Sequence, residues 1–227
     1  MKYIDVSTRK QTFSPEKYDK NIVATLPYYE EYFKQIIEIV YTAFHMPIAW
    51  LDIGCGTGKM ADMAIRNLQV ENMVCCDNSP QMLKIAKERI CSLKVDFRET
   101  LIQNLQYDSD FDVITAILIT HYLKNEEKIA SIRNCYNALK KNGLFFTVEN
   151  FAPNNDIVKR LYLERWKKYQ YENGKSEEEC QSHIFRYNTE YFPVTIMEQI
   201  NVLKECGFMN VEIFWCSYMQ VGILGIK

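Results

Sequence analysis

Ala49-Trp50-Leu51-Asp52-Ile53-Gly54-Cys55-Gly56-Thr57-Gly58-Lys59 is the stretch that decides the fold of this chain. A short apolar run ends with an acid, and three alternating glycines follow before a helical pattern begins. Glycines at such a turn let the backbone bend sharply and bring its amide groups close to a ligand. The stretch therefore predicts a nucleotide-binding turn at the end of a parallel β-strand.

The spacing of the glycines narrows the class of ligand. A dinucleotide fingerprint is G-x-G-x-x-G, whereas Gly54, Gly56 and Gly58 form G-x-G-x-G. Asp52 stands two positions before the first glycine, where a carboxylate is unsuited to a pyrophosphate but suited to an ammonium group. We expect a nucleoside that carries an amino acid. The alternative is a tight strand–helix turn without a ligand.

Asp77 is the second acid of interest. It lies about 20 residues after Gly58, at the end of the next predicted strand, where an acid accepts hydrogen bonds from the two ribose hydroxyls. The alternative is a turn residue or a helix cap, because Asn78-Ser79-Pro80 follows. Together with the glycine turn, Asp77 favours ribose binding.

Strands alternate with helices along most of the chain, which predicts a doubly wound α/β fold with a mostly parallel, Rossmann-like sheet. The predicted strands are 49–53, 73–76, 93–97, 111–118, 144–148, 211–215 and 219–226. The last two are joined so closely that they must be antiparallel. Helices are predicted to open at Ser14 and Pro27, to follow the cap Ser79, and to cover 59–68, 126–139, much of 154–191, and 195–206. Lys140-Lys141-Asn142-Gly143 is expected to close the helix 126–139.

Composition and charge exclude several classes of protein. With 227 residues, 48% of them apolar, the chain can bury a core and is not expected to be disordered. A net charge of −2 gives no basic field, so neither nucleic acid nor an anionic membrane is the expected partner. Eight cysteines without a C-x-x-C pair indicate free thiols in a reducing compartment, and no metal site is expected. Residues 1–20 lack the apolar core of a signal peptide and no run could span a membrane, so we expect a soluble, cytoplasmic protein.

The line from Leu51 to Gly58, with Asp77-Asn78-Ser79 and Met82 downstream, resembles the class I S-adenosylmethionine-dependent methyltransferases over residues 48–150. The resemblance implies a seven-stranded sheet with an antiparallel last strand, and S-adenosyl-L-methionine as the cofactor. The glycine turn would pass its methionine part, the strand-two acid would hold its ribose, and the loop after the third strand would lie beside its adenine. In that loop, Leu101 stands where the family often has an adenine-binding Asp. The cofactor-binding residues implied in this way are Tyr29, Asp52, Gly54, Cys55, Gly56, Gly58, Asp77, Asn78, Met82, Thr100, Leu101 and Ile117.

Three residues are candidates for catalysis. His121 follows the fourth strand, at an edge that in this family lies under the reactive sulfonium, and an imidazole with an ordinary pKa of about 6.5 can act as a general base near neutral pH. The alternative is a structural histidine that holds the turn to a backbone carbonyl. Glu149 ends the fifth strand, where polar residues line the crevice of open α/β sheets. Tyr18 belongs to the N-terminal helices that the resemblance places over the cofactor.

Segments outside the sheet are similar to carboxy-S-adenosylmethionine synthases and related small methyltransferases. These segments are Tyr18-Asp19, Leu26-Pro27-Tyr28-Tyr29, Ser176-Glu177-Glu178-Glu179, and Leu203 to Trp215. The resemblance implies N-terminal cap helices in 1–47, a methyltransferase domain in 48–227 and a helical lid in 151–195, and it is compatible with a homodimer. In a synthase, a lid arginine should meet the extra carboxylate as a bidentate partner. Arg186 is close to that region, but Ile184 falls at the expected place.

The expected function is in-line methyl transfer from S-adenosylmethionine to a small-molecule acceptor, bound between the N-terminal helices and the lid. One alternative is a carboxy-S-adenosylmethionine synthase-like enzyme that serves the modification of the tRNA wobble uridine. The other is a non-catalytic protein that binds S-adenosylmethionine. The sequence does not name the acceptor.

Overall fold

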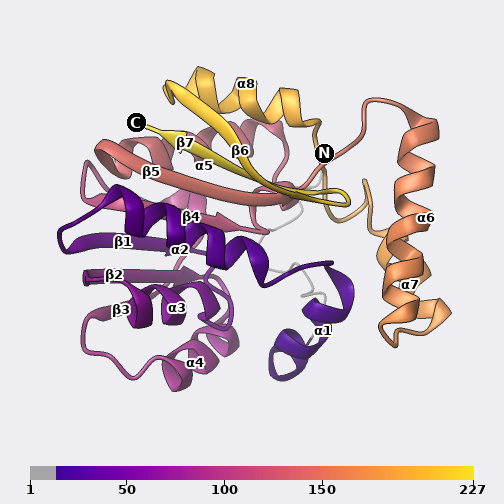
Figure 1. Ribbon diagram of the computed structural model, residues 1–227, viewed down its shortest axis with the longest axis horizontal. Coiled ribbons are helices and arrows are strands. Elements are labelled where there is room, and N and C mark those ends of the chain that lie inside the picture. Colours follow the sequence, from indigo (N-terminus) through magenta and orange to yellow (C-terminus); the bar gives the residue numbers. More distant parts are fainter. Residues whose placement is uncertain (1–13) are drawn as a thin grey trace.

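A seven-stranded sheet forms the centre of the protein. The structure is a computed structural model that describes residues 14–227, so the first part of the predicted cap segment lies outside the described residues. The strand order is β3-β2-β1-β4-β5-β7-β6. Strands β1 to β5 are parallel, and β7 runs antiparallel to both β5 and β6. The predicted doubly wound α/β fold with an antiparallel last strand is confirmed (Figure 1).

The bounds of the elements follow the predicted alternation. The strands are β1 (Ile48–Ile53), β2 (Val70–Asp77), β3 (Val95–Glu99), β4 (Phe111–Ile117), β5 (Leu139–Asn150), β6 (Asn210–Ser217) and β7 (Gln220–Ile226). The helices are α1 (Tyr18–Thr25), α2 (Glu31–Ala43), α3 (Lys59–Asn67), α4 (Pro80–Arg89), α5 (Asn125–Ala138), α6 (Asp156–Glu172), α7 (Glu177–Phe185) and α8 (Ile196–Cys206), with short 3-10 turns η2 (Pro15–Lys17), η3 (Ile102–Asn104) and η4 (Thr120–Tyr122). Within residues 14–227, none of the helices has the length and apolar character needed to cross a bilayer.

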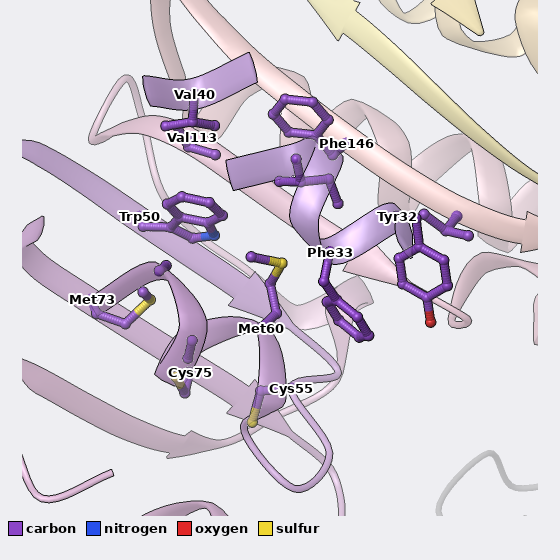
Figure 2. Packing of buried hydrophobic residues seen from close by; sticks show 14 of the residues in the cluster. Tyr32, Phe33, Val40, Trp50, Cys55, Met60, Met73, Cys75, Val113 and Phe146 are labelled. Atoms are coloured by element: carbon purple, nitrogen blue, oxygen red, sulfur yellow. The ribbon is translucent and has the colours of Figure 1, made fainter. Parts of the chain in front are cut away.

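Helices cover both faces of the sheet. Residues of α2, α3 and α4 form a core on one face, and residues of α5 and α8 form a core on the other. Phe33 and Val40 recur on one side of α2 and are buried in the same core cluster as Trp50 and Val113 of the central strands (Figure 2). All six residues of β1 are buried. The glycine turn therefore begins at the end of a strand that is held from both sides.

Some boundaries differ from the sequence predictions. The helix expected to open at Pro27 begins at Glu31, because Tyr28 has a left-handed backbone (φ 56°) that a right-handed helix cannot contain. Strand β2 begins earlier than predicted, at Val70, and β3 begins later, at Val95. The apolar pattern identified these elements but not their ends.

The segment Lys140 to Gly143 does not close a helix, and this prediction was wrong. Helix α5 ends at Ala138, and β5 begins with the next residue. The backbone N–H of Asn142 donates to the carbonyl of Lys227 at 2.8 Å, so the segment is tied to the end of β7. Its basic residues and glycine are typical of a helix end, but pairing with the C-terminal strand places them in the sheet.

Helices α1, α6 and α7 lie beyond the carboxyl ends of the parallel strands, away from the two helical layers (Figure 1). The lid predicted for 151–195 contains α6 and α7. The indole N–H of Trp166 donates to the carbonyl of Thr25 at 2.6 Å, and the Tyr169 hydroxyl donates to the carbonyl of Val23 at 3.1 Å. Helix α6 is therefore joined to α1. The two segments meet over the edge of the sheet where the strand order reverses between β1 and β4, the usual ligand site of such sheets.

Candidate active site

The turn after β1 lines a cavity at this edge of the sheet. Gly54 and Gly56 have left-handed backbone conformations (φ 63° and 53°), which residues with side chains rarely adopt. A Cβ atom on Gly54 would lie 2.0 Å from Cδ1 of Ile119, so that position has no room for one. A Cβ atom on Gly56 would meet nothing within 4 Å. Both glycines belong to the cavity wall, which they build from backbone atoms.

The Asp77 carboxylate stands at the end of β2 on the same wall, and the residue is only 8% exposed. Its Oδ2 accepts the N–H of Gly56 at 2.9 Å, and its Oδ1 accepts the N–H of Ser79 at 2.9 Å. Burial raises the pKa of this carboxyl, and the backbone donors of Ser79 and Gly56 oppose the shift. Each oxygen keeps a lone pair for a second donor. The carboxylate that fixes the glycine turn can thus also accept hydrogen bonds from a diol in the cavity.

The cavity extends from the glycine turn along the ends of β3 and β4 to the lid. Its wall is largely apolar beside the glycine turn, with Met82, Leu101 and Ile102. At the lid it is aromatic and polar, with His183 and Arg186. Eight of the residues predicted from the resemblance lie on this wall, namely Gly54, Gly56, Asp77, Asn78, Met82, Thr100, Leu101 and Ile117.

Glu149 organises the turn that follows β4. Its Oε1 accepts the backbone N–H groups of Ile119 (3.2 Å) and Thr120 (2.8 Å) and the hydroxyl of Thr147 (3.0 Å). Its Oε2 accepts the backbone N–H of His121 and pairs with Nδ1 of the same imidazole. Burial acts to raise the pKa of Glu149, but His121 and the backbone donors outweigh it, so the pKa lies below its usual range. The ring of His121 is thus held by a carboxylate, and not by a backbone carbonyl as in the alternative interpretation.

His121 is buried and lies on the cavity wall, so its imidazole joins the site to the Glu149 network. Since Nδ1 pairs with Glu149, Nε2 is the ring nitrogen left for a ligand. Tyr18 of α1 also lies on the wall. Burial raises the pKa of its phenol well above the usual value, so Tyr18 stays protonated at neutral pH.

Comparison with known proteins shows what this chain is similar to. A sequence model described as "Methyltransferase domain" matches residues 51–143. A carboxy-S-adenosyl-L-methionine synthase from Nautilia profundicola is 25% identical over 199 residues, covering 86% of this chain and 84% of that protein. One from Staphylococcus epidermidis is 24% identical over 229 residues, covering 97% and 96%. A solved structure from Thermotoga maritima, described as an S-adenosylmethionine-dependent methyltransferase and possible histamine N-methyltransferase, superposes with a TM-score of 0.60 at 15% identity, covering 93% of this chain and 95% of that one.

Residues 51–143 thus match a methyltransferase domain, and the chain has the fold of the solved S-adenosylmethionine-dependent methyltransferases to which it is similar.

The cavity of this protein fits S-adenosylmethionine. The lone pairs that Asp77 keeps free suit the two ribose hydroxyls, and the bare backbone at Gly56 leaves room for the methionine part. Met82 and Leu101 supply an apolar flank for the adenine ring. Because Leu101 has no acceptor in its side chain, the adenine amino group would have to use backbone carbonyls.

Four predicted cofactor residues, Tyr29, Asp52, Cys55 and Gly58, are not on the cavity wall. Tyr29 packs edge-on against Phe33, with ring centroids 5.1 Å apart. Asp52 and Cys55 are buried among the central strands, and Gly58 opens α3. The structure thus places these four residues in the packing around the site, and their contact with the cofactor stays a prediction. The sequence alone does not give the direction of each side chain.

Replacing Asp52 by Asn should stabilise the protein at alkaline pH. Asp52 is buried under the glycine turn, its Oδ1 accepts the Thr115 hydroxyl at 2.7 Å, and its Oδ2 has no partner among the described residues. Burial raises its pKa to about 7. A raised folded-state pKa means that the folded state loses relative stability between the usual carboxyl pKa, near 4, and about pH 7. The Asn variant lacks this loss, which amounts to a few kcal/mol, roughly 4 at most.

The measurement for Asp52 is the free energy of urea unfolding of both proteins at pH 5 and pH 8. The advantage of the Asn variant should grow between the two values. An advantage that is equal at both pH values would contradict the assignment of a raised pKa to Asp52.

Several wall residues were not predicted as site residues. They are Ile22, Thr25, Leu26, Gln103, Tyr122, Asn150, His183, Arg186 and Tyr191, among others. His183 packs edge-on against Trp166 with ring centroids 4.7 Å apart, and burial lowers its pKa to about 3. Its Nε2 has no hydrogen-bond partner among residues 14–227. The signal in the sequence was weak, because His183 is an isolated histidine in a polar helix.

Proposed function

We propose that the protein transfers the methyl group of S-adenosylmethionine to a small-molecule acceptor that binds between α1 and the lid, beside His121. The observation that carries this proposal is one continuous cavity that joins Asp77 and Gly56 at one end to His121, His183 and Arg186 at the other. The first end has the groups that suit the cofactor. The second end has aromatic and polar side chains that the cofactor does not require, which suits an acceptor.

The residues of the chain contribute mainly by orientation. Bound S-adenosylmethionine supplies an electrophilic methyl group. Holding the acceptor atom in line with that group can account for about 7–11 kcal/mol of the barrier. For an acceptor that arrives protonated, Nε2 of His121 would take the proton, and Glu149 would stabilise the imidazolium through Nδ1. The protonated Tyr18 phenol would donate a hydrogen bond at the same end of the site.

A small acceptor is favoured by the way the cavity is covered. Helix α1 and the lid are joined through Trp166 and Tyr169, and residues of both lie on the wall. A large polymer would have to displace this cover. The net charge of −2 adds no attraction for a polyanion.

A second candidate function is that of a carboxy-S-adenosylmethionine synthase-like enzyme. The relatives from Nautilia profundicola and Staphylococcus epidermidis carry that name and match 86% and 97% of the chain. Arg186 is buried on the cavity wall, beside its ion-pair partner Glu190, and a guanidinium there suits a carboxylate. This chain has Ile184 at the position where the resemblance leads us to expect the arginine, so Arg186 would have to take that role from a different position.

Mass spectrometry of the ligand that copurifies with the protein separates the two functions. We expect S-adenosylmethionine or S-adenosylhomocysteine, and transfer of label from methyl-labelled S-adenosylmethionine to a small molecule in a metabolite extract. The Asp77→Ala protein, which should retain little cofactor, is the blank for both measurements. The mass of a carboxylated cofactor, or a complete lack of labelled product, would contradict methyl transfer.

A further inference from the structure

Three side chains from three separate elements contact one another at the glycine turn. They are Asp19, Thr57 and Arg89, and we call this group the Asp19 clasp. Asp19 belongs to α1, Thr57 to the glycine turn, and Arg89 is the last residue of α4. The Thr57 hydroxyl donates to Oδ1 of Asp19 at 2.7 Å, and Nη1 of Arg89 donates to the Thr57 hydroxyl oxygen at 2.9 Å. Nη2 of Arg89 forms an ion pair with Oδ2 of Asp19. Each of the three side chains thus contacts the other two.

The clasp lies directly behind the cavity wall. Tyr18 and Gly56, which lie on that wall, are the neighbours in sequence of Asp19 and Thr57. Ile22 and Thr25 continue the wall along α1. Because these residues cover the cavity beside the glycine turn, moving α1 away from that turn would open the cofactor end of the cavity. Such a movement must break all the contacts that Asp19 makes with Thr57 and Arg89.

Two other hydrogen bonds of α1 do not oppose the same movement. Trp166 and Tyr169 of α6 bind the backbone of α1 at Thr25 and Val23, so they join α1 to the lid and not to the glycine turn. Helix α1 can therefore move together with α6 while these two hydrogen bonds stay intact. The clasp is a polar link between this joined cover and the cofactor-binding turn.

We propose that the Asp19 clasp sets the rate at which S-adenosylmethionine and S-adenosylhomocysteine exchange, by holding α1 against the glycine turn. Thr57 is buried, whereas the side chains of Arg89 and Asp19 are 26% and 40% exposed. A partly exposed ion pair is weakened by solvent and by salt. It is therefore suited to a contact that must open once in each catalytic cycle.

The test is the dissociation rate of labelled S-adenosylhomocysteine, chased with an excess of unlabelled ligand. Asp19→Asn and Arg89→Gln should each release the ligand about three- to thirty-fold faster than the wild type, because each loses a charged hydrogen-bonding partner. The matched control is Arg66→Gln. Arg66 pairs with Asp62 within α3 at 2.7 Å, so this variant loses the same charge without loosening a link between elements. Its release rate should equal that of the wild type.

Ionic strength gives a second readout that needs no variant. Release from the wild type should become faster as salt screens the Asp19–Arg89 pair, and this dependence should be reduced in both clasp variants. A variant that is only less stable would still release the ligand faster at higher salt, as the wild type does. Release rates within twofold of the wild type in both variants, or a salt dependence that both variants retain in full, would overturn the proposal.

Discussion

Replacing Asp77 by Ala should weaken the binding of S-adenosylmethionine by roughly 10- to 150-fold. The carboxylate fixes the glycine turn through the N–H of Gly56, and it is the acceptor on the wall that suits the ribose hydroxyls. A hydrogen bond to a charged group contributes about 1.5–3 kcal/mol, and each 1.4 kcal/mol is a factor of ten in affinity. Titration calorimetry of both proteins with S-adenosylmethionine at neutral pH measures the effect.

The control for Asp77 is Asp96→Ala. Asp96 lies on the neighbouring strand β3, its side chain is half exposed, and it pairs with Arg98 at 2.7 Å away from the cavity wall. This variant should bind the ligand as the wild type does. If a folded Asp77→Ala protein also keeps the wild-type affinity, the ribose does not bind at Asp77, and the assignment of the cofactor end of the cavity is lost.

Replacing Glu149 by Gln should lower the free energy of unfolding by about 3–5 kcal/mol at pH 7, the usual cost of leaving a buried charge network without one partner. The amide NH2 of Gln would face the backbone N–H donors of Ile119 and of η4, which now meet a carboxylate oxygen. The variant should also lose activity, because the ring of His121 would no longer be held by an anion. Urea denaturation followed by circular dichroism measures the change in stability.

The pH dependence distinguishes the charge of Glu149 from its shape. Its folded-state pKa lies below the ordinary value of 4.5, so its stabilising contribution is complete above that value and is lost as the pH falls through the folded-state pKa. The difference between wild type and variant should therefore shrink below about pH 4.5. The control is Glu71, an exposed residue that also lies on the sheet. The free energy of unfolding of the Glu71→Gln variant should equal that of the wild type, both at pH 7 and below about pH 4.5. A difference for Glu149→Gln that persists in acid would mean that packing, and not charge, is lost.

The cofactor end of the site could be predicted from the sequence because its determinants are local. The residues Gly54, Gly56 and Asp77 are placed by a strand, a turn and the next strand, whose order the apolar pattern gives directly. Asp52 shows the limit of such an argument. Its spacing from the glycines predicts a carboxylate that meets an ammonium group, whereas in the structure its side chain points to Thr115 on the adjacent strand β4. Only the pairing of the strands shows that direction.

The acceptor end could not be predicted in the same way because its determinants are tertiary. His183 and Arg186 reach the cavity through the angle at which α7 packs on α6, and no motif encodes that angle. Arg186 also lies two positions after Ile184, where a gapless comparison places the family's arginine. Tertiary packing also overrode a local signal at Lys140 to Gly143, where a sequence typical of a helix end begins a strand.

The most direct test of the account is a crystal structure of the protein with S-adenosylhomocysteine. The account predicts that the ribose hydroxyls lie within hydrogen-bonding distance of the Asp77 carboxylate, that the amino-acid part passes Gly56, and that the sulfur faces the side of the cavity formed by His121 and the lid. A ligand bound outside this cavity, or with its ribose away from Asp77, would contradict the account.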